Sequence, residues 1–274
     1  MDDWTEMNRR VWDERAAPHS ASPDYAVQRF VDEPDFISDV VRFDLPRLPD
    51  VRGRRGVHLQ CHIGTDTLSL ARLGADMTGL DFSGPALAEA ASLAARTGTA
   101  VEWVEAPVEK ALEVLPTGAF DLVFTGIGAL CWLPDVAAWA CTVAALLRPG
   151  GELFIREGHP MLWTLDETRM DDLTVRYPYF ETAEPVVFDE PGTYVESAHE
   201  FVHTRSASWN HGLGETVSAV LAAGLRVTLL EEHRSVPWEA LPGRMERDDA
   251  GAWRLKDGQD LVPLTWTLRA TKAP

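Results

Sequence analysis

A tight loop, followed by an acidic residue at the end of the next apolar run, is the part of this sequence most able to do chemistry. The apolar residues 57–61 lead into a loop that ends at Gly64, and a helical pattern begins at Thr65 or Asp66. A second apolar run, 77–80, ends at Asp81. In a strand–loop–helix–strand unit, the loop and helix N-terminus bind the polar tail of a nucleotide-like ligand, and the acid accepts hydrogen bonds from ribose hydroxyls. The spacing therefore predicts a nucleotide-type cofactor site at Gly64 and Asp81.

The loop also carries two polar side chains that could contact such a ligand. The Gln60 amide could bond a carboxylate or an amine, or it could tie the loop together, and His62 could stack or bond nearby. Gly64 would let the backbone approach the ligand, although a plain turn also uses glycine. The dinucleotide fingerprint needs three glycines and the turn has only Gly64, which disfavours a nicotinamide cofactor but leaves an NAD-dependent oxidoreductase as an alternative.

With the segments around it, this loop resembles the class I S-adenosylmethionine-dependent methyltransferases. The segments similar to family motifs occur in the family's order, at residues 58–64, 79–83, 120–135 and 146–155. The first motif of the family is an acid followed by x-G-x-G-x-G; here His58 replaces the acid, and Gln60 and His62 replace two glycines. More weakly, the chain resembles a bacterial small-molecule methyltransferase subgroup whose first motif contains Leu-Gln-Cys-His, a subgroup without one defining reaction.

The resemblance implies S-adenosylmethionine as cofactor and S-adenosylhomocysteine as product. It assigns Asp81 to the ribose hydroxyls and Phe82 to the adenine ring, with core packing as the alternative for Phe82. Thr125 and Gly126 end the fourth strand and should run beside the methionine part of the cofactor, since ligands of this architecture bind at the carboxyl ends of strands.

Recognition of adenine departs from the family pattern. The acidic residue that often binds the exocyclic amine is replaced here by Pro107. The resemblance therefore points to backbone groups at Pro107 and Val108, or to the nearby carboxylates of Glu105 and Glu109.

Candidates for acceptor chemistry follow the fifth strand. Methyl transfer from a sulfonium is a direct displacement, and a base is needed only if the acceptor must lose a proton. His159 has a suitable ordinary pKa, and Glu157 could orient it or bind a cationic substrate. Gly-His-Pro is also an ordinary turn, so a structural role for His159 stays open, and His211 and His19 are weaker candidates.

Strand and helix patterns alternate through the core, which predicts a mainly parallel α/β sheet with helices on both faces. Strands are expected near 56–61, 76–81, 101–105, 120–125, 151–157, 225–231 and 261–271, and helices near 65–74, 85–97, 135–147 and 214–223. The resemblance implies the Rossmann-like class I fold, a seven-stranded, mostly parallel sheet whose last strand is antiparallel.

Four parts of the chain are expected. They are an N-terminal helical lid at 1–50, a cofactor-binding core at 51–158, an insertion after the fifth strand that forms the acceptor pocket at 159–208, and the C-terminal part of the core sheet at 209–274. An amphipathic helix should carry Trp4 and Trp12, and these tryptophans could equally cap the core without forming a lid. A second helix should lie near 36–43, and Pro18, Pro23 and Pro34 should break the segment into short pieces. Aromatic residues interleaved with prolines in the insertion predict short antiparallel strands and loops.

Composition narrows the class of protein. The chain has 274 residues with a formal net charge of −18, which disfavours nucleic acid as substrate and fits a small-molecule acceptor. No apolar run is long enough for a membrane span, no signal peptide is expected, and no cysteine has metal-ligand spacing. We therefore expect a cytoplasmic, metal-free enzyme whose oligomeric state is open, a homodimer included. A non-catalytic adenosylmethionine-binding module remains an alternative.

Overall fold

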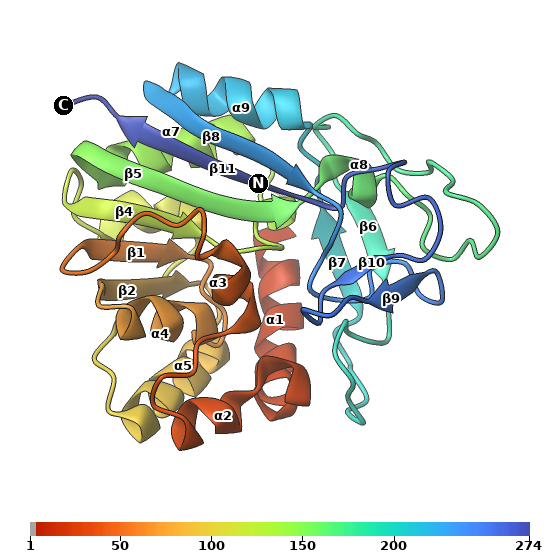
Figure 1. Cartoon of the computed structure of the whole chain (residues 1–274), viewed down its shortest axis with the longest axis horizontal. Helices are drawn as coiled ribbons and strands as arrows, with labels where there is room; N and C mark the ends of the chain where they lie inside the picture. Colours follow the sequence, from red (N-terminus) through yellow and green to blue (C-terminus); the bar gives the residue numbers. More distant parts are fainter. Residues whose placement is uncertain (1–3) are drawn as a thin grey trace.

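A seven-stranded sheet organises the structure, a computed structural model that describes residues 4–274 (Figure 1). The strand order is β3-β2-β1-β4-β5-β11-β8, and only β11 runs antiparallel to its neighbours. The strands are β1 Arg55–Leu59, β2 Asp76–Asp81, β3 Glu102–Glu105, β4 Phe120–Thr125, β5 Leu147–Gly158, β8 Leu225–His233 and β11 Thr265–Lys272. This confirms the predicted class I methyltransferase fold.

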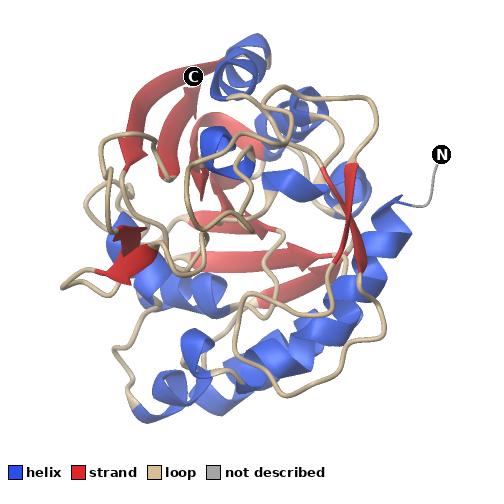
Figure 2. Cartoon of the chain, turned by 90° about the vertical axis from the view of Figure 1, so that its right-hand side faces the viewer, coloured by secondary structure: helices blue, strands red, loops and turns tan. Residues whose placement is uncertain are grey.

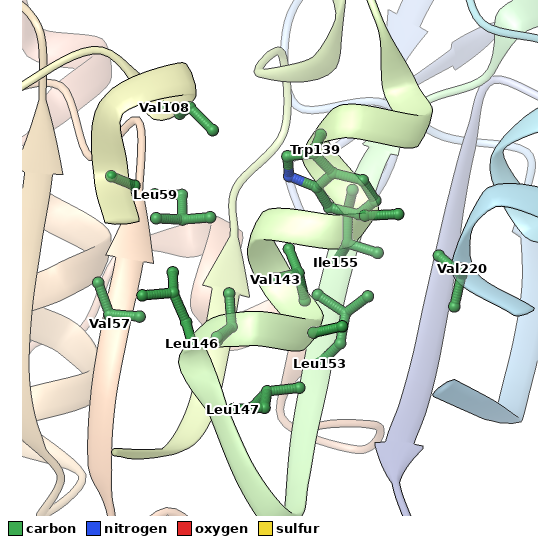
Figure 3. Packing of buried hydrophobic residues seen from close by; sticks show 14 of the residues in the cluster. Val57, Leu59, Val108, Trp139, Val143, Leu146, Leu147, Leu153, Ile155 and Val220 are labelled. Carbon is green, nitrogen blue, oxygen red and sulfur yellow. The ribbon is translucent and has the colours of Figure 1, made fainter. Parts of the chain in front are cut away.

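Helices cover both faces of the sheet. Successive side chains of each strand point to opposite faces, and on both faces these side chains are apolar. On one face Val57, Leu153 and Ile155 pack beneath α7 and α9 (Figure 3), and on the other Leu122 and Phe154 pack against α3 and α4. The helices are α1 Trp4–Ala21, α2 Val27–Asp32, α3 Asp39–Asp44, α4 Thr65–Arg72, α5 Gly84–Thr97, α6 Ala111–Val114, α7 Val136–Leu146, α8 Pro160–Trp163 and α9 Leu213–Ala222, with short 3₁₀ turns η1 Pro23–Tyr25, η2 Val108–Lys110 and η3 Leu130–Trp132.

The N-terminal helix is longer than predicted. Pro18 lies inside α1 and does not break it, which corrects the expectation of short pieces. Proline removes one helical hydrogen bond and crowds the preceding turn, but α1 is held by packing on α5 and β7. Buried Asn8 also exchanges two hydrogen bonds with the Ala207 backbone, of 2.9 and 2.8 Å. Tertiary contacts therefore override the local signal.

The insertion contains the short antiparallel strands expected of it, β6 Val186–Asp189 and β7 Arg205–Ser208. A second small sheet was not predicted. It consists of β9 Met245–Arg247 and β10 Trp253–Leu255, in the connection between β8 and β11. The last core strand also begins at Thr265 rather than near 261, because Pro263, which cannot donate to a ladder, precedes it. Both small sheets lie beyond the carboxyl ends of the core strands, on the right in Figure 1 and toward the viewer in Figure 2.

None of the helices described in residues 4–274 is both long and apolar enough to cross a lipid bilayer.

Candidate functional site

A cavity of about 770 Å³ opens at the carboxyl ends of β1, β2 and β4. One end is formed by the loop after β1 and by the residues that follow β2 and β4. The other end is formed by the insertion and by the β8–β11 connection. Its volume falls in the range of small-molecule and cofactor sites. The predicted cofactor loop and the predicted acceptor segment therefore share one cavity.

The loop after β1 keeps the backbone shape of a glycine loop without most of the glycines. Gln60 has φ +58° and His62 has φ +50°, both in the left-handed region that side chains rarely adopt. The His62 backbone N–H donates to Asp81 Oδ2 at 2.8 Å, which fixes the loop to the end of β2. Strained conformations of this kind persist where the surrounding structure holds them, often at ligand sites.

Asp81 is buried at the cavity wall. Its second carboxylate oxygen accepts the Ser83 backbone N–H at 2.9 Å. Burial raises the pKa of Asp81 to about 6, against the backbone N–H groups that lower it. Each oxygen of an ionised carboxylate can accept a second hydrogen bond. Asp81 can therefore hold the loop and still accept from ribose hydroxyls.

The structure separates the predicted cofactor residues into two groups. Those that line the cavity are Gln60, His62, Asp81, Phe82 and Gly126. Gly64, Pro107, Val108 and Thr125 are outside the lining. A Cβ on Gly64 would meet the Trp103 ring at 2.5 Å, and Val108, in η2, packs in the core near Leu59 (Figure 3). Packing accounts for the glycine at 64 and for Val108, and contact of this second group with a cofactor stays a prediction.

Buried polar atoms at the floor of the cavity fit the methionine end of the cofactor. Gln60 Oε1 and His58 Nε2 are buried and have no hydrogen-bond partner in residues 4–274. A Cβ on Gly126 would lie only 3.2 Å from His58 Nε2, closer than an ordinary contact, so the backbone at Gly126 approaches the ring closely. Partnerless buried polar atoms are uncommon in proteins and need an explanation, a bound ligand among them.

Aromatic residues close the roof over the loop. His19 from α1 bonds His62 Nε2 at 2.9 Å and Thr193 Oγ1 at 2.7 Å, which joins α1, the loop and the insertion. The Trp12 ring contacts His62 edge-on, with centroids 5.1 Å apart. Burial lowers the pKa of His19 to about 3, so the ring is neutral near pH 7. The N-terminal helix therefore packs over the loop after β1, and its role as a lid stays a prediction.

The acceptor end is rich in aromatic rings. Trp163 and Trp238 stack with centroids 5.7 Å apart, one from α8 and the other from the β8–β11 connection. Other aromatic residues of the cavity lining are Tyr177, Phe188, Trp209 and Trp253, whereas Trp132 and Tyr194 pack against Trp12 near the loop after β1, with ring centroids 5.3 and 6.5 Å away. Neither Trp238 nor Trp253 was predicted from the sequence to lie in the site. Tryptophans in a long connection between two core strands were a signal that could have found them.

The two predicted acceptor-chemistry residues are outside the lining of the large cavity. The Glu157 carboxylate accepts backbone N–H groups of Gly128 at 2.6 Å and of Ala129 and Leu130 at 2.8 and 2.9 Å. It thereby shapes the turn after β4. Burial raises its pKa, against these N–H groups.

Both ring nitrogens of His159 are also occupied. Nδ1 accepts the Met161 N–H at 3.0 Å and caps α8, and Nε2 lies 2.8 Å from Glu232 Oε1. His211 likewise bonds the Glu181 carboxylate and two backbone carbonyls. A direct part for these side chains in the reaction stays a prediction, and their contacts fit positioning roles.

Across residues 4–274, no cluster of histidine, cysteine, aspartate and glutamate is arranged to hold a metal ion.

Comparisons with known proteins agree with this geometry. Residues 57–153 match the family model described as "Methyltransferase domain". The chain is 36% identical over 107 residues to the ubiquinone biosynthesis O-methyltransferase of Ralstonia nicotianae, covering 39% of this chain and 44% of that protein. It is 34% identical over 114 residues to the Photorhabdus laumondii protein of the same name, covering 42% and 47%. The match thus spans about half the length of these curated relatives.

Solved structures extend the likeness to most of the chain. An S-adenosylmethionine-dependent methyltransferase from Mesorhizobium loti aligns with a TM-score of 0.58 at 22% identity, over 88% of this chain and 100% of that chain. One from Methanosarcina mazei aligns with a TM-score of 0.56 at 16% identity, over 84% and 97%. Such low identity shows the fold alone. Together, these comparisons show that residues 57–153 match a methyltransferase domain, and that the chain has the fold of the S-adenosylmethionine-dependent methyltransferases with which it aligns.

Proposed function

We propose that this protein transfers a methyl group from S-adenosylmethionine to an oxygen or nitrogen of a small-molecule acceptor. The single observation that carries the proposal is the continuous cavity, which joins Asp81 and Gln60 at one end to the aromatic residues around Trp238 at the other. A bound sulfonium cofactor supplies an electrophilic methyl group. Direct displacement then needs the acceptor, the methyl carbon and the sulfur in line, so alignment supplies much of the rate.

This chain's residues have separate parts in that alignment. Asp81 would hold the ribose, Phe82 would pack on the adenine, and the Gly126 backbone would run beside the methionine part. Trp12 and His19 from α1 would exclude water from above the cofactor. Glu157 would keep the turn after β4 in place through its three N–H bonds to residues 128–130.

The acceptor end favours a flat or hydrophobic substrate. Stacked Trp163 and Trp238 offer ring faces, and aromatic pairs contribute about 0.5–1.5 kcal/mol beyond the area that they bury. The curated relatives are named as O-methyltransferases of ubiquinone biosynthesis, which supports an aromatic hydroxyl as one acceptor class to test. A hydroxyl acceptor must lose a proton. His159 is the base that the sequence predicted, and the carboxylates of Glu167 and Glu190 line the cavity itself.

A thermal-shift titration with S-adenosylmethionine, S-adenosylhomocysteine and NAD tests the cofactor. Ligand at about a hundred times its dissociation constant stabilises a protein by roughly 2.7 kcal/mol, which raises the melting temperature by several degrees at this size. We expect a rise with both adenosyl compounds that is smaller in Asp81→Ala. A rise with NAD alone would overturn the proposal in favour of an oxidoreductase.

Transfer of a labelled methyl group to a panel of phenols, amines and carboxylates then tests the reaction. Product with any member distinguishes an enzyme from a non-catalytic adenosylmethionine-binding module, which would bind the cofactor and yield none.

A further inference from the structure

Gln60 presents an acceptor atom to the cavity floor. Its Nε2 donates to the Ala129 carbonyl at 3.0 Å, which fixes the amide so that Oε1 is the free atom. That oxygen is buried and has no partner in residues 4–274. The residue also occupies a left-handed conformation, φ +58°, where the family motif has a glycine. A side chain at this strained position is explained if its amide has a ligand to bind.

His58 has a buried ring nitrogen, Nε2, which is an acceptor in the tautomer whose Nδ1–H donates to Thr67. The ring is 3% exposed, and burial lowers its pKa to about 3, so it is neutral near pH 7. Nδ1 lies 2.9 Å from the Thr67 hydroxyl, whereas Nε2 is buried without a partner in the described part of the chain. A neutral ring whose Nδ1–H donates to Thr67 presents Nε2 as an acceptor.

Asp66 adds negative charge at the same point. A Cβ built on Gly126 would lie 3.2 Å from His58 Nε2 and 3.7 Å from Asp66 Oδ2, so these two atoms flank the space above that glycine. Asp66 lines the cavity from the first turn of α4; burial raises its pKa, while the Ser38 side chain and the nearby Arg156, which pairs with Asp44 at 3.2 Å, oppose that shift. The floor therefore offers two neutral acceptors and one carboxylate.

The complementary ligand group is a primary ammonium. It carries three N–H donors and one positive charge, and hydrogen bonds that involve a charged partner are the stronger ones. An anion would face the carboxylate, and a neutral hydroxyl could donate to only one acceptor. We propose that Gln60 Oε1, His58 Nε2 and the Asp66 carboxylate bind the α-ammonium group of the cofactor's methionine end, in place of the glycine-loop backbone. This inference rests on the proposed function, because it concerns the same cofactor.

Three adenosyl compounds separate this contact from the rest of the cofactor. S-Adenosylhomocysteine has the ammonium and the carboxylate, decarboxylated S-adenosylmethionine has the ammonium alone, and 5′-methylthioadenosine has neither. Their dissociation constants would be measured by calorimetry for the unaltered protein and for Gln60→Met, Gln60→Gly and Asp66→Asn. Exposed Gln28→Met and Asp76→Asn are matched controls, Asp76 lying at the opposite end of β2 from Asp81.

We expect the variants at 60 and 66 to weaken both ammonium-bearing compounds about tenfold each and methylthioadenosine less than about twofold. Gln60→Gly restores the glycine that suits this φ, so it separates loss of the amide from backbone strain. Equal weakening of all three compounds, or no weakening, would overturn the inference while leaving the proposed function intact. Weakening of S-adenosylhomocysteine alone would overturn it too, because the cluster would then hold the carboxylate. Failure of the unaltered protein to bind any adenosyl compound would overturn the proposed function and the inference with it.

Discussion

The two ends of the cavity are built in different ways. The cofactor end comes from neighbouring strands of one parallel sheet, whose carboxyl ends bring Gln60, Asp81 and Gly126 together. The acceptor end comes from segments far apart in the chain, with Trp163 from α8 meeting Trp238 from the β8–β11 connection. Under the proposed function, sheet geometry would position the cofactor, and loops placed on that sheet would select the acceptor.

Replacing Asp81 should have the largest effect on ligand binding, and it should affect only the binding of the cofactor. Asp81→Ala removes a buried carboxylate whose charge-assisted bonds to ribose are worth about 1.5–3 kcal/mol. We expect S-adenosylhomocysteine affinity to fall about ten- to hundredfold by calorimetry. Asp76→Ala, at the exposed start of the same strand, should bind normally. Unchanged affinity in Asp81→Ala would refute the ribose assignment.

Lowering the pH should weaken cofactor binding, as the loss of the Asp81 carboxylate does. Burial raises the pKa of Asp81 to about 6, and ribose hydroxyls favour the ionised form as acceptor. The affinity for S-adenosylhomocysteine should therefore be constant above about pH 7 and fall by up to about tenfold per pH unit below pH 6. Calorimetry from pH 8 to pH 5 measures this, with Asp81→Asn as the control that should lose the dependence. A flat profile in the unaltered protein would mean that Asp81 does not hold the ribose as a carboxylate.

Removal of a stacked tryptophan should weaken binding of the acceptor and leave binding of the cofactor unchanged. Trp238→Ala leaves the Trp163 ring without its partner, an aromatic contact worth about 0.5–1.5 kcal/mol. Once an acceptor is known, we expect its KM to rise roughly threefold to tenfold while S-adenosylhomocysteine affinity stays unchanged. Phe180→Ala, an exposed aromatic of the insertion outside the cavity lining, is the matched control. A loss of cofactor affinity in Trp238→Ala would show that the two ends are not independent.

His159 should give the smallest effect, and it distinguishes chemistry from positioning. The ring caps α8 and contacts Glu232, so His159→Ala should cost about 1 kcal/mol of stability and reduce turnover, with cofactor affinity intact. His159→Asn keeps a capping side chain but cannot serve as a base. Recovery of turnover in His159→Asn would assign a positioning role, and continued loss would support proton transfer. Full turnover in His159→Ala would leave His159 structural only.

Local patterns in the sequence predicted the core well. The alternation of apolar runs and capped helices gave the sheet, and the acid after the second apolar run gave a cavity residue, because strand period, helix caps and strand ends are local properties. Pro18 is the local signal that failed. Buried contacts of α1 with β7 and α5 outweigh one lost helical hydrogen bond.

By itself, the sequence determined the class of fold, the position of the cofactor loop and the acid that follows it, since these depend on residues close together in the chain. Only the tertiary structure decided that His58 and Gln60, at two replaced motif positions, both line the cavity and each keep a buried polar atom without a partner in the described residues. It also decided that Trp238 stacks on Trp163. In the same way, it decided that the Glu157 carboxylate and His159 Nδ1 accept hydrogen bonds from backbone N–H groups. Such contacts join segments that no local pattern relates, because their free energy comes from burial and hydrogen bonding across the folded chain.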